Sequence, residues 1–209
     1  MKITIETSEL SVQTRTLIAE ETSETSVLIT LAEDADRHVR YAVAENRRTP
    51  EEMLEKLSGD SNRLVRIAVA KNEKTSFDVL AKLSCDENFE VRQAVAVLIN
   101  GKEVPDEIFA KLSEDENYIV RCILARKNNV PVDILRKLAT DEVAAVRGAV
   151  AINKRAPIEV LEKLAEDKAW YVRQGVAENE VAPVEILMRL LKDNEEAVRL
   201  SAAESLRVK

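Results

Sequence analysis

Residues 60–72 read DSNRLVRIAVAKN, and this pattern returns along most of the chain. A Val-Arg pair occurs seven times, and the steps between its arginines are 26, 26, 29, 26, 26 and 26 residues. An Asp stands six residues before each of them. The arginines are Arg40, Arg66, Arg92, Arg121, Arg147, Arg173 and Arg199, and the aspartates are Asp34, Asp60, Asp86, Asp115, Asp141, Asp167 and Asp193. A fixed period of this length predicts a chain of seven similar repeats.

The segment that precedes each aspartate is predicted to be a short helix that begins at Pro. Residues 49–60 read TPEEMLEKLSGD, and their leucines follow an LxxL spacing. All five prolines of the chain share one repeat position, at Pro50, Pro105, Pro131, Pro157 and Pro183. Pro suits the first helical position because no N–H is needed there, and Thr49 with Glu52 matches a capping box. Glu52 and Lys56 are spaced i, i+4, so we expect them to pair along the helix.

The segment that follows each aspartate is predicted to be a second helix. Asp is a favourable N-cap, so we expect this helix to begin at residues such as Asp60. Asn46, Asn72, Asn153 and Asn179 follow the second helix, and we expect them to end it in a left-handed or turn conformation. Two short helices cannot bury their apolar faces alone, so the repeats must stack on one another. The predicted fold class is therefore all-α, an α-solenoid of two-helix repeats.

The amino-acid composition excludes several classes of fold and function. The chain has 209 residues, 4 Gly, 1 His and 2 Cys, with a net charge of −7. So few turn residues argue against a β-sandwich or barrel, and one His with two Cys argues against a His- or Cys-based metal site. We expect no cofactor. The N-terminus lacks the pattern of a secretory signal, and the longest apolar run, Ala94 to Ile99, is six residues. We therefore expect a cytoplasmic protein that does not associate with membranes.

The repeat resembles the leucine-rich repeat variant family in the residues quoted above, namely Val65 to Asn72 and Thr49 to Asp60. The resemblance covers about residues 24–209. It implies a right-handed superhelix in which α-helices alternate with shorter 3₁₀ helices, so that the Pro-led helix is short or partly 3₁₀. The spacing from Asp to Val-Arg is also similar to that of HEAT repeats. One member of the variant family carries an iron–sulfur segment with clustered Cys, and this sequence has no such cluster.

Two departures from the period suggest how the chain is divided. Residues 1–23 precede the first full repeat, and we interpret them as a helical half-repeat that caps the stack. Residues 24–209 then form one solenoid domain of seven tandem repeats. The linker at residues 97–104 is three residues longer than its counterparts. It is either an extended helix end or a loop that contacts a partner, and we favour the extended helix.

The columns of Asp and Arg allow two interpretations. Seven arginines could line a groove for phosphate or carboxylate groups. Alternatively, each Arg is held by the Asp of its own repeat or of a neighbouring one, which would form a ladder of ion pairs along the solenoid. Every Arg has a matching Asp, so we favour the structural ladder. A pI near 5.1 and this pairing of charges also lead us to expect no nucleic-acid partner.

The positions that vary between repeats are better candidates for a binding site. The third and fourth residues after each Asp hold four of the seven aromatic residues of the chain: Phe89, Tyr118, Trp170 and Tyr171. Aromatic side chains are common anchors of protein interfaces, although each ring could instead cover the edge of the neighbouring repeat. We predict a non-enzymatic scaffold that binds an unidentified protein. The alternatives are a HEAT-like nucleic-acid-binding protein and an enzyme-accessory protein of the lyase type. The binding face, the oligomeric state and the reactivity of Cys85 stay open.

Overall fold

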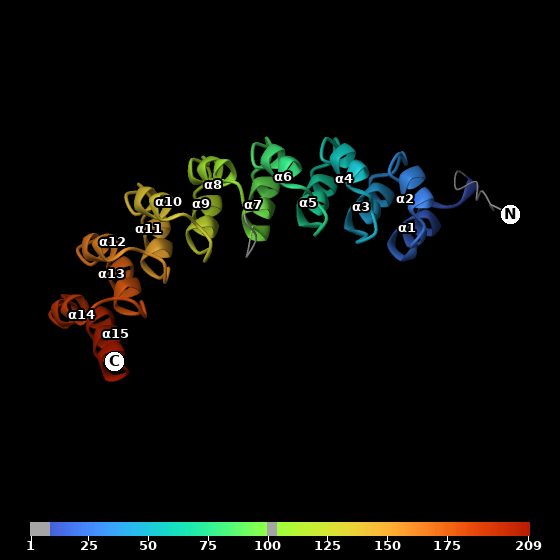
Figure 1. Cartoon of the computed structure of the whole chain (residues 1–209). Coiled ribbons are helices and arrows are strands. Elements are labelled where there is room, and N and C mark those ends of the chain that lie inside the picture. Colours follow the sequence, from blue (N-terminus) through green and yellow to red (C-terminus); the bar gives the residue numbers. More distant parts are fainter. Residues whose placement is uncertain (1–8, 100–103) are drawn as a thin grey trace. The chain divides into compact units, whose positions relative to one another are not determined.

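The computed structural model describes residues 9–99 and 104–209, and these residues form fifteen α-helices and no strand (Figure 1). The prediction of an all-α solenoid is confirmed. The odd-numbered helices contain the Val-Arg pairs or their counterpart: α1 (Val12–Glu21), α3 (Arg37–Glu45), α5 (Arg63–Lys71), α7 (Phe89–Leu98), α9 (Tyr118–Ala125), α11 (Ala144–Ala151), α13 (Trp170–Ala177) and α15 (Glu196–Arg207). The even-numbered helices are the predicted first helices: α2 (Thr25–Leu31), α4 (Glu51–Leu57), α6 (Phe77–Leu83), α8 (Asp106–Ser113), α10 (Val132–Leu138), α12 (Ile158–Leu164) and α14 (Val184–Leu190). These even helices are short, as expected, but they are α-helical rather than 3₁₀.

The chain divides into two compact units, which we call unit 1 (Met1–Leu98) and unit 2 (Ile99–Lys209). Within each unit, consecutive odd helices pack side by side, and each odd helix also contacts even helices beside it in sequence (Figure 1). The division of residues 24–209 into seven repeats of one domain, and their right-handed course, stay predictions.

The core follows from two columns of apolar side chains. The valine before each repeated arginine is fully buried, and so are the alanines and valines that follow on the same face. The LxxL pairs of the even helices supply the second column, and all of their members are buried: Leu28, Leu31, Leu54, Leu57, Leu80, Leu83, Phe109, Leu112, Leu135, Leu138, Leu161, Leu164, Leu187 and Leu190. Because odd helices lie directly against one another, small alanines between the valines allow close packing.

The repeated aspartate does not cap the second helix, contrary to our expectation. The odd helices begin three residues after it, for example at Arg63 after Asp60. Each repeated Asp instead accepts a hydrogen bond from the backbone N–H two residues later, at 2.8–2.9 Å. The cap itself comes from Asp36, Asn62 or Asn117 where the sequence provides one. The repeated carboxylate is therefore free to make a contact outside its own turn.

The prediction of a capping box at Thr49 is also wrong. The Thr49 Oγ1 hydroxyl is buried and donates to the carbonyl oxygen of Val43 at 2.5 Å, and Thr75 makes the equivalent bond to Val69. Pro50 occupies the N-cap position and α4 starts one residue later. A hydroxyl that is committed to the end of the preceding helix cannot cap the next one, so these threonines fix the turn between the two helices.

The long linker is only partly within the described residues. Helix α7 has 10 residues, one more than α3 or α5, and ends at Leu98. The side chain of Ile99 is buried, whereas that of Val97 is exposed. Residues 100–103, where a contacting loop would lie, fall outside the described part of the chain.

Across residues 9–99 and 104–209, no helix combines the length and the apolar character needed to span a lipid bilayer.

Prediction on the core: Leu161→Ala removes a fully buried side chain of α12 and should lower the free energy of unfolding by about 2–5 kcal/mol. Met188→Ala on α14 is the control, because this side chain is largely exposed and its loss should change the free energy by less than about 0.5 kcal/mol. Urea unfolding followed by circular dichroism measures both. Equal losses would contradict the assignment of the LxxL column to the core.

Candidate functional site

Five of the repeated arginines connect their own repeat to the next one. Arg40 Nε lies 2.6 Å from Asp60 Oδ2, and Arg40 Nη2 lies 3.0 Å from Asp60 Oδ1. The remaining nitrogen, Nη1, donates to the carbonyl oxygen of Asp34 in the arginine's own repeat at 2.8 Å. The same two-pronged contact, with distances of 2.6–2.9 Å, is present in the pairs Arg66–Asp86, Arg121–Asp141, Arg147–Asp167 and Arg173–Asp193. One guanidinium thus holds the backbone of its own repeat and the carboxylate of the following one.

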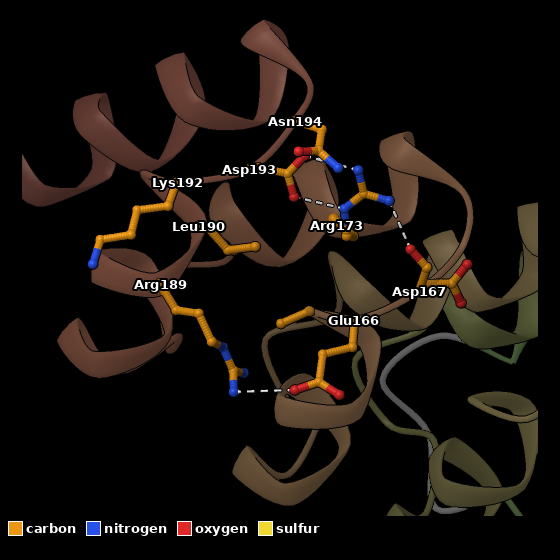
Figure 2. Close-up of a pocket in the computed structure, with 9 residues that line it drawn as sticks. Glu166, Asp167, Arg173, Arg189, Leu190, Lys192, Asp193 and Asn194 are labelled. Carbon is orange, nitrogen blue, oxygen red and sulfur yellow. Dashed lines mark hydrogen bonds and ion pairs between the residues drawn. The ribbon is translucent and has the colours of Figure 1, made fainter.

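Figure 2 shows this arrangement around Arg173. Its guanidinium lies between the carbonyl oxygen of Asp167 at 2.7 Å and the carboxylate of Asp193. The pocket in this view is lined by ladder residues, by Arg189, whose Nη1 lies 3.3 Å from Glu166, and by Lys192. Since Arg173 and Arg189 both pair with carboxylates, the arginines of this pocket are not free to bind an anionic ligand.

One member of this ladder lies outside the Val-Arg pattern of the sequence. Arg15 in α1 makes the two-pronged contact to Asp34, at 2.6 and 3.1 Å. It is preceded by Thr14 instead of Val, so a search for Val-Arg passes over it. At the other end, Arg199 donates only to the carbonyl oxygens of Asp193 and Asn194, and it meets no carboxylate in the part of the chain that the structure describes. Arg92 donates to the carbonyl oxygens of Asp86 and Glu87, at 2.8 and 3.2 Å.

The ladder lies mostly out of water, which determines its energetics. In the Arg66–Asp86 pair the side chains are only 9% and 7% exposed. Burial alone would raise the pKa of Asp60, Asp141 and Asp167, but the arginine hydrogen bond and a backbone N–H outweigh it and hold each pKa below its ordinary value. At Asp193 the Arg173 hydrogen bond is the largest influence and lowers the pKa. Each carboxylate therefore stays ionised beside its guanidinium.

A second ladder, made by asparagines, was not foreseen. Asn72 Nδ2 donates to the carbonyl oxygens of Ala44 and Asn46 in the preceding repeat, at 2.8 and 3.1 Å. Asn46, Asn153 and Asn179 make the same backward contacts, and all four side chains are 2–9% exposed. The expected left-handed conformation is wrong for Asn46 and Asn72, because their backbones are extended, with φ of −67° and −72°. The regular spacing of these residues in the sequence is the signal that could have revealed the ladder.

The basic column of the even helices also reaches across repeats. Lys56 Nζ lies 2.5 Å from Glu33, and Lys137 Nζ lies 2.7 Å from Glu114, both in the turn of the preceding repeat. The expected pairing of Glu52 with Lys56 along the same helix is therefore wrong. These are exposed ion pairs, which contribute little to stability because water screens both charges.

The predicted aromatic residues are partly exposed, at 39% for Phe89, 46% for Tyr118 and 44% for both Trp170 and Tyr171. The structure brings two of them together, because the rings of Trp170 and Tyr171 meet edge to face with centroids 5.9 Å apart. Tyr118 lies on α9 of the same unit, whereas Phe89 belongs to unit 1. The ring of Tyr171 also lies close to Gly148 of α11, so it packs on the neighbouring repeat while remaining accessible.

The described residues offer little chemistry of other kinds. In residues 9–99 and 104–209, no three His, Cys, Asp or Glu side chains are grouped to hold a metal ion. Cys85 is exposed, and burial raises the pKa of the Cys122 thiol. His38 is exposed and its Nδ1 lies 2.9 Å from Asp36.

Comparisons with known proteins match this helical-repeat structure. Residues 37–62, from α3 to the residue that caps α5, match the sequence model of the leucine rich repeat variant. A solved structure described as a leucine-rich repeat variant with a novel repetitive motif is 29% identical, with a TM-score of 0.75 over 95% of this chain and 78% of that chain. The Escherichia coli protein YibA is 22% identical, with a TM-score of 0.51 over 83% of this chain and 76% of that chain. No curated protein matches the sequence significantly.

The fold shows that the chain is a helical-repeat protein, in which charged side chains join the repeats. The comparisons confirm that its repeat resembles the leucine-rich repeat variant.

Prediction on the ladder: Asp141→Ala leaves Arg121, which is 8% exposed, without its carboxylate and should lower the free energy of unfolding by about 3–5 kcal/mol. Asp133→Ala is the matched control, because Asp133 pairs with Arg136 on the surface and should contribute less than about 1 kcal/mol. Chemical unfolding of the two variants makes the comparison. If both variants lose the same free energy, the ladder is not what joins the repeats.

Prediction on pH: the pKa of each of Asp34, Asp60, Asp141, Asp167 and Asp193 is lower in the folded chain than its ordinary value. The unfolded chain therefore takes up protons first as the pH falls, and this stabilisation is lost as the pH falls from about 5 through the folded pKa values below about 4. Thermal unfolding should be measured from neutral pH to a pH of about 3. The midpoint temperature should stay constant near neutral pH and then fall as the solution becomes acidic. A midpoint that does not fall on acidification would contradict the ladder's role.

Proposed function

We propose that this chain is a non-enzymatic helical-repeat scaffold that binds another protein through exposed, repeat-variable positions of its odd helices. The observation that carries the proposal is the group of partly exposed aromatic side chains on α9 and α13, namely Tyr118, Trp170 and Tyr171. They stand on a frame whose buried valines, leucines, arginines and asparagines serve the stacking of the repeats. Aromatic residues that remain accessible on such a frame are typical anchors of protein interfaces.

The paired charges of the ladder support this function over nucleic-acid binding. Affinity for phosphates depends on lysines and arginines that are free to replace counterions. Here the arginines of the ladder bind aspartates, several basic residues of the even helices bind glutamates, and the net charge is −7. The fold alone says nothing of the partner's identity.

Prediction on binding: the intact chain, immobilised on beads, should capture a protein from cell lysate, and a Tyr118→Ala/Trp170→Ala double variant should not. Truncating an interface anchor typically costs about 2 kcal/mol or more, so two such losses should abolish capture. Met188→Ala, which shortens an equally exposed side chain of even helix α14, is the control and should capture the same protein.

Capture that survives the double variant would show that this surface is not the binding site. Nucleic acid recovered with every form of the chain would favour a nucleic-acid-binding protein, and a bound chromophore would favour an enzyme-accessory protein of the lyase type.

A further inference from the structure

Unit 2 carries an exposed apolar surface on three consecutive odd helices. Helices α9, α11 and α13 pack side by side, and four apolar side chains of α9 and α13, together with Ile152 directly after α11, are between 36% and 46% exposed. We call them the unit 2 apolar face: Tyr118, Ile119, Ile152, Trp170 and Tyr171. Apolar side chains that gather on neighbouring elements with a polar border mark interaction surfaces more often than isolated ones do.

The middle helix of this face is lined by small side chains. Helix α11 has Ala144, Ala145 and Gly148 at the positions that hold Tyr118, Ile119 and Cys122 on α9. The side chains at these positions are therefore bulky on α9 and α13 and small on α11, which lies between them. A bulky apolar side chain of a partner would find aromatic neighbours on α9 and α13 and room above α11.

One edge of the face is basic at two of its three helices. The turns that follow α9 and α11 contain Arg126, Lys127, Lys154 and Arg155, whereas the turn that follows α13 contains Glu178 and Glu180. Lys154 pairs with Glu180 at 2.7 Å, but Arg126 and Arg155 are exposed and contact no carboxylate among the described residues. Arg155 Nη1 donates to the carbonyl oxygen of Asn128 at 3.1 Å, which holds its guanidinium beside the turn that follows α9.

At the opposite edge of the face, Glu116 and Glu142 lie in the turns that precede α9 and α11, and Lys168 lies in the turn that precedes α13. Helix α11 has eight residues and is therefore about 12 Å long, which is more than the Debye length of about 8 Å at physiological salt. A partner that lies across these helices meets positive charge at one end and negative charge at the other, so its own charges determine whether and how it docks.

We propose that the unit 2 apolar face docks a segment of another protein that combines bulky apolar side chains with Asp or Glu. The apolar side chains lie over α9, α11 and α13, and the carboxylates pair with Arg126 and Arg155. This inference rests on the proposed scaffold function and adds the location of the site and the chemistry of its partner. A polyanion fits less well, because the guanidinium groups of Arg126 and Arg155 share their edge of the face with Glu178 and Glu180.

Selection of a random peptide library, displayed on phage, against the intact chain tests the proposal. The enriched peptides should combine bulky apolar residues with Asp or Glu. An enriched peptide, synthesised with a fluorophore and titrated by anisotropy, should bind at least about tenfold more weakly to Arg126→Glu and to Tyr118→Ala, since a tenfold change corresponds to about 1.4 kcal/mol. Arg126→Lys keeps the charge and should retain most of the affinity.

Two variants of unit 1 are matched controls. Lys71 on α5 occupies the repeat position of Arg126, and Leu64 on α5 is the exposed counterpart of Ile119, so Lys71→Glu and Leu64→Ala are the two control variants. Neither should weaken the peptide. All of these side chains are at least partly exposed, so circular dichroism should show the same helix content in each variant.

The outcomes separate this proposal from the scaffold function. Enriched peptides that are basic, or that bind the Arg126→Glu and Tyr118→Ala variants unchanged, would overturn the proposed site and leave the scaffold function standing. A fluorescent single-stranded oligonucleotide that binds through Arg126, with no peptide enriched, would overturn it in favour of nucleic acid. Failure to enrich any peptide also overturns it, and together with an empty lysate capture it overturns the scaffold function as well.

Discussion

The two-pronged ion pair between an arginine of one repeat and the aspartate of the next is the interaction on which the rest of the structure depends. Arg121 and Asp141 illustrate it, with both contacts at 2.7–2.9 Å and both side chains nearly buried. A guanidinium fork binds a carboxylate in one plane and at one distance, so within each unit the pair fixes the position of one odd helix relative to the next. The asparagine ladder acts in the opposite direction, since Asn153 reaches back to Ala125.

These two ladders leave the outer positions of the odd helices free to vary. The valines and alanines between them are buried, and the charged groups of the frame are occupied by one another. An exposed residue that takes no part in an ion pair of the frame therefore indicates where a partner could bind. Tyr118, Trp170 and Arg126 are residues of this kind. The surface proposed for partner binding is thus what remains of α9, α11 and α13 once the requirements of stacking are met.

Much of this architecture could be predicted from the period alone, because Val65 and Leu54 are buried for reasons that their spacing reveals. The sequence could not show which aspartate each arginine binds, because an arginine has one aspartate six residues before it and another twenty residues after it. Asn72 ends α5 as local rules suggested, but those rules do not reveal that its side-chain amide donates to carbonyl oxygens of the preceding repeat. Of the site, the aromatic positions were foreseen, but Ile119 and Ile152 resemble core residues in the sequence, and the basic edge emerges only when two turns lie side by side.

The central claim is that Arg147 acts across repeats, and a double-mutant cycle tests it most directly. The free energy of unfolding would be measured for Arg147→Met, Asp167→Asn, Asp141→Asn and the two double variants that contain Arg147→Met. The structure predicts a coupling above about 1 kcal/mol between Arg147 and Asp167, and one within about 0.5 kcal/mol of zero between Arg147 and the Asp141 side chain. Coupling to Asp141 alone would mean that each repeat closes on itself, and it would contradict this account of how the solenoid is held together.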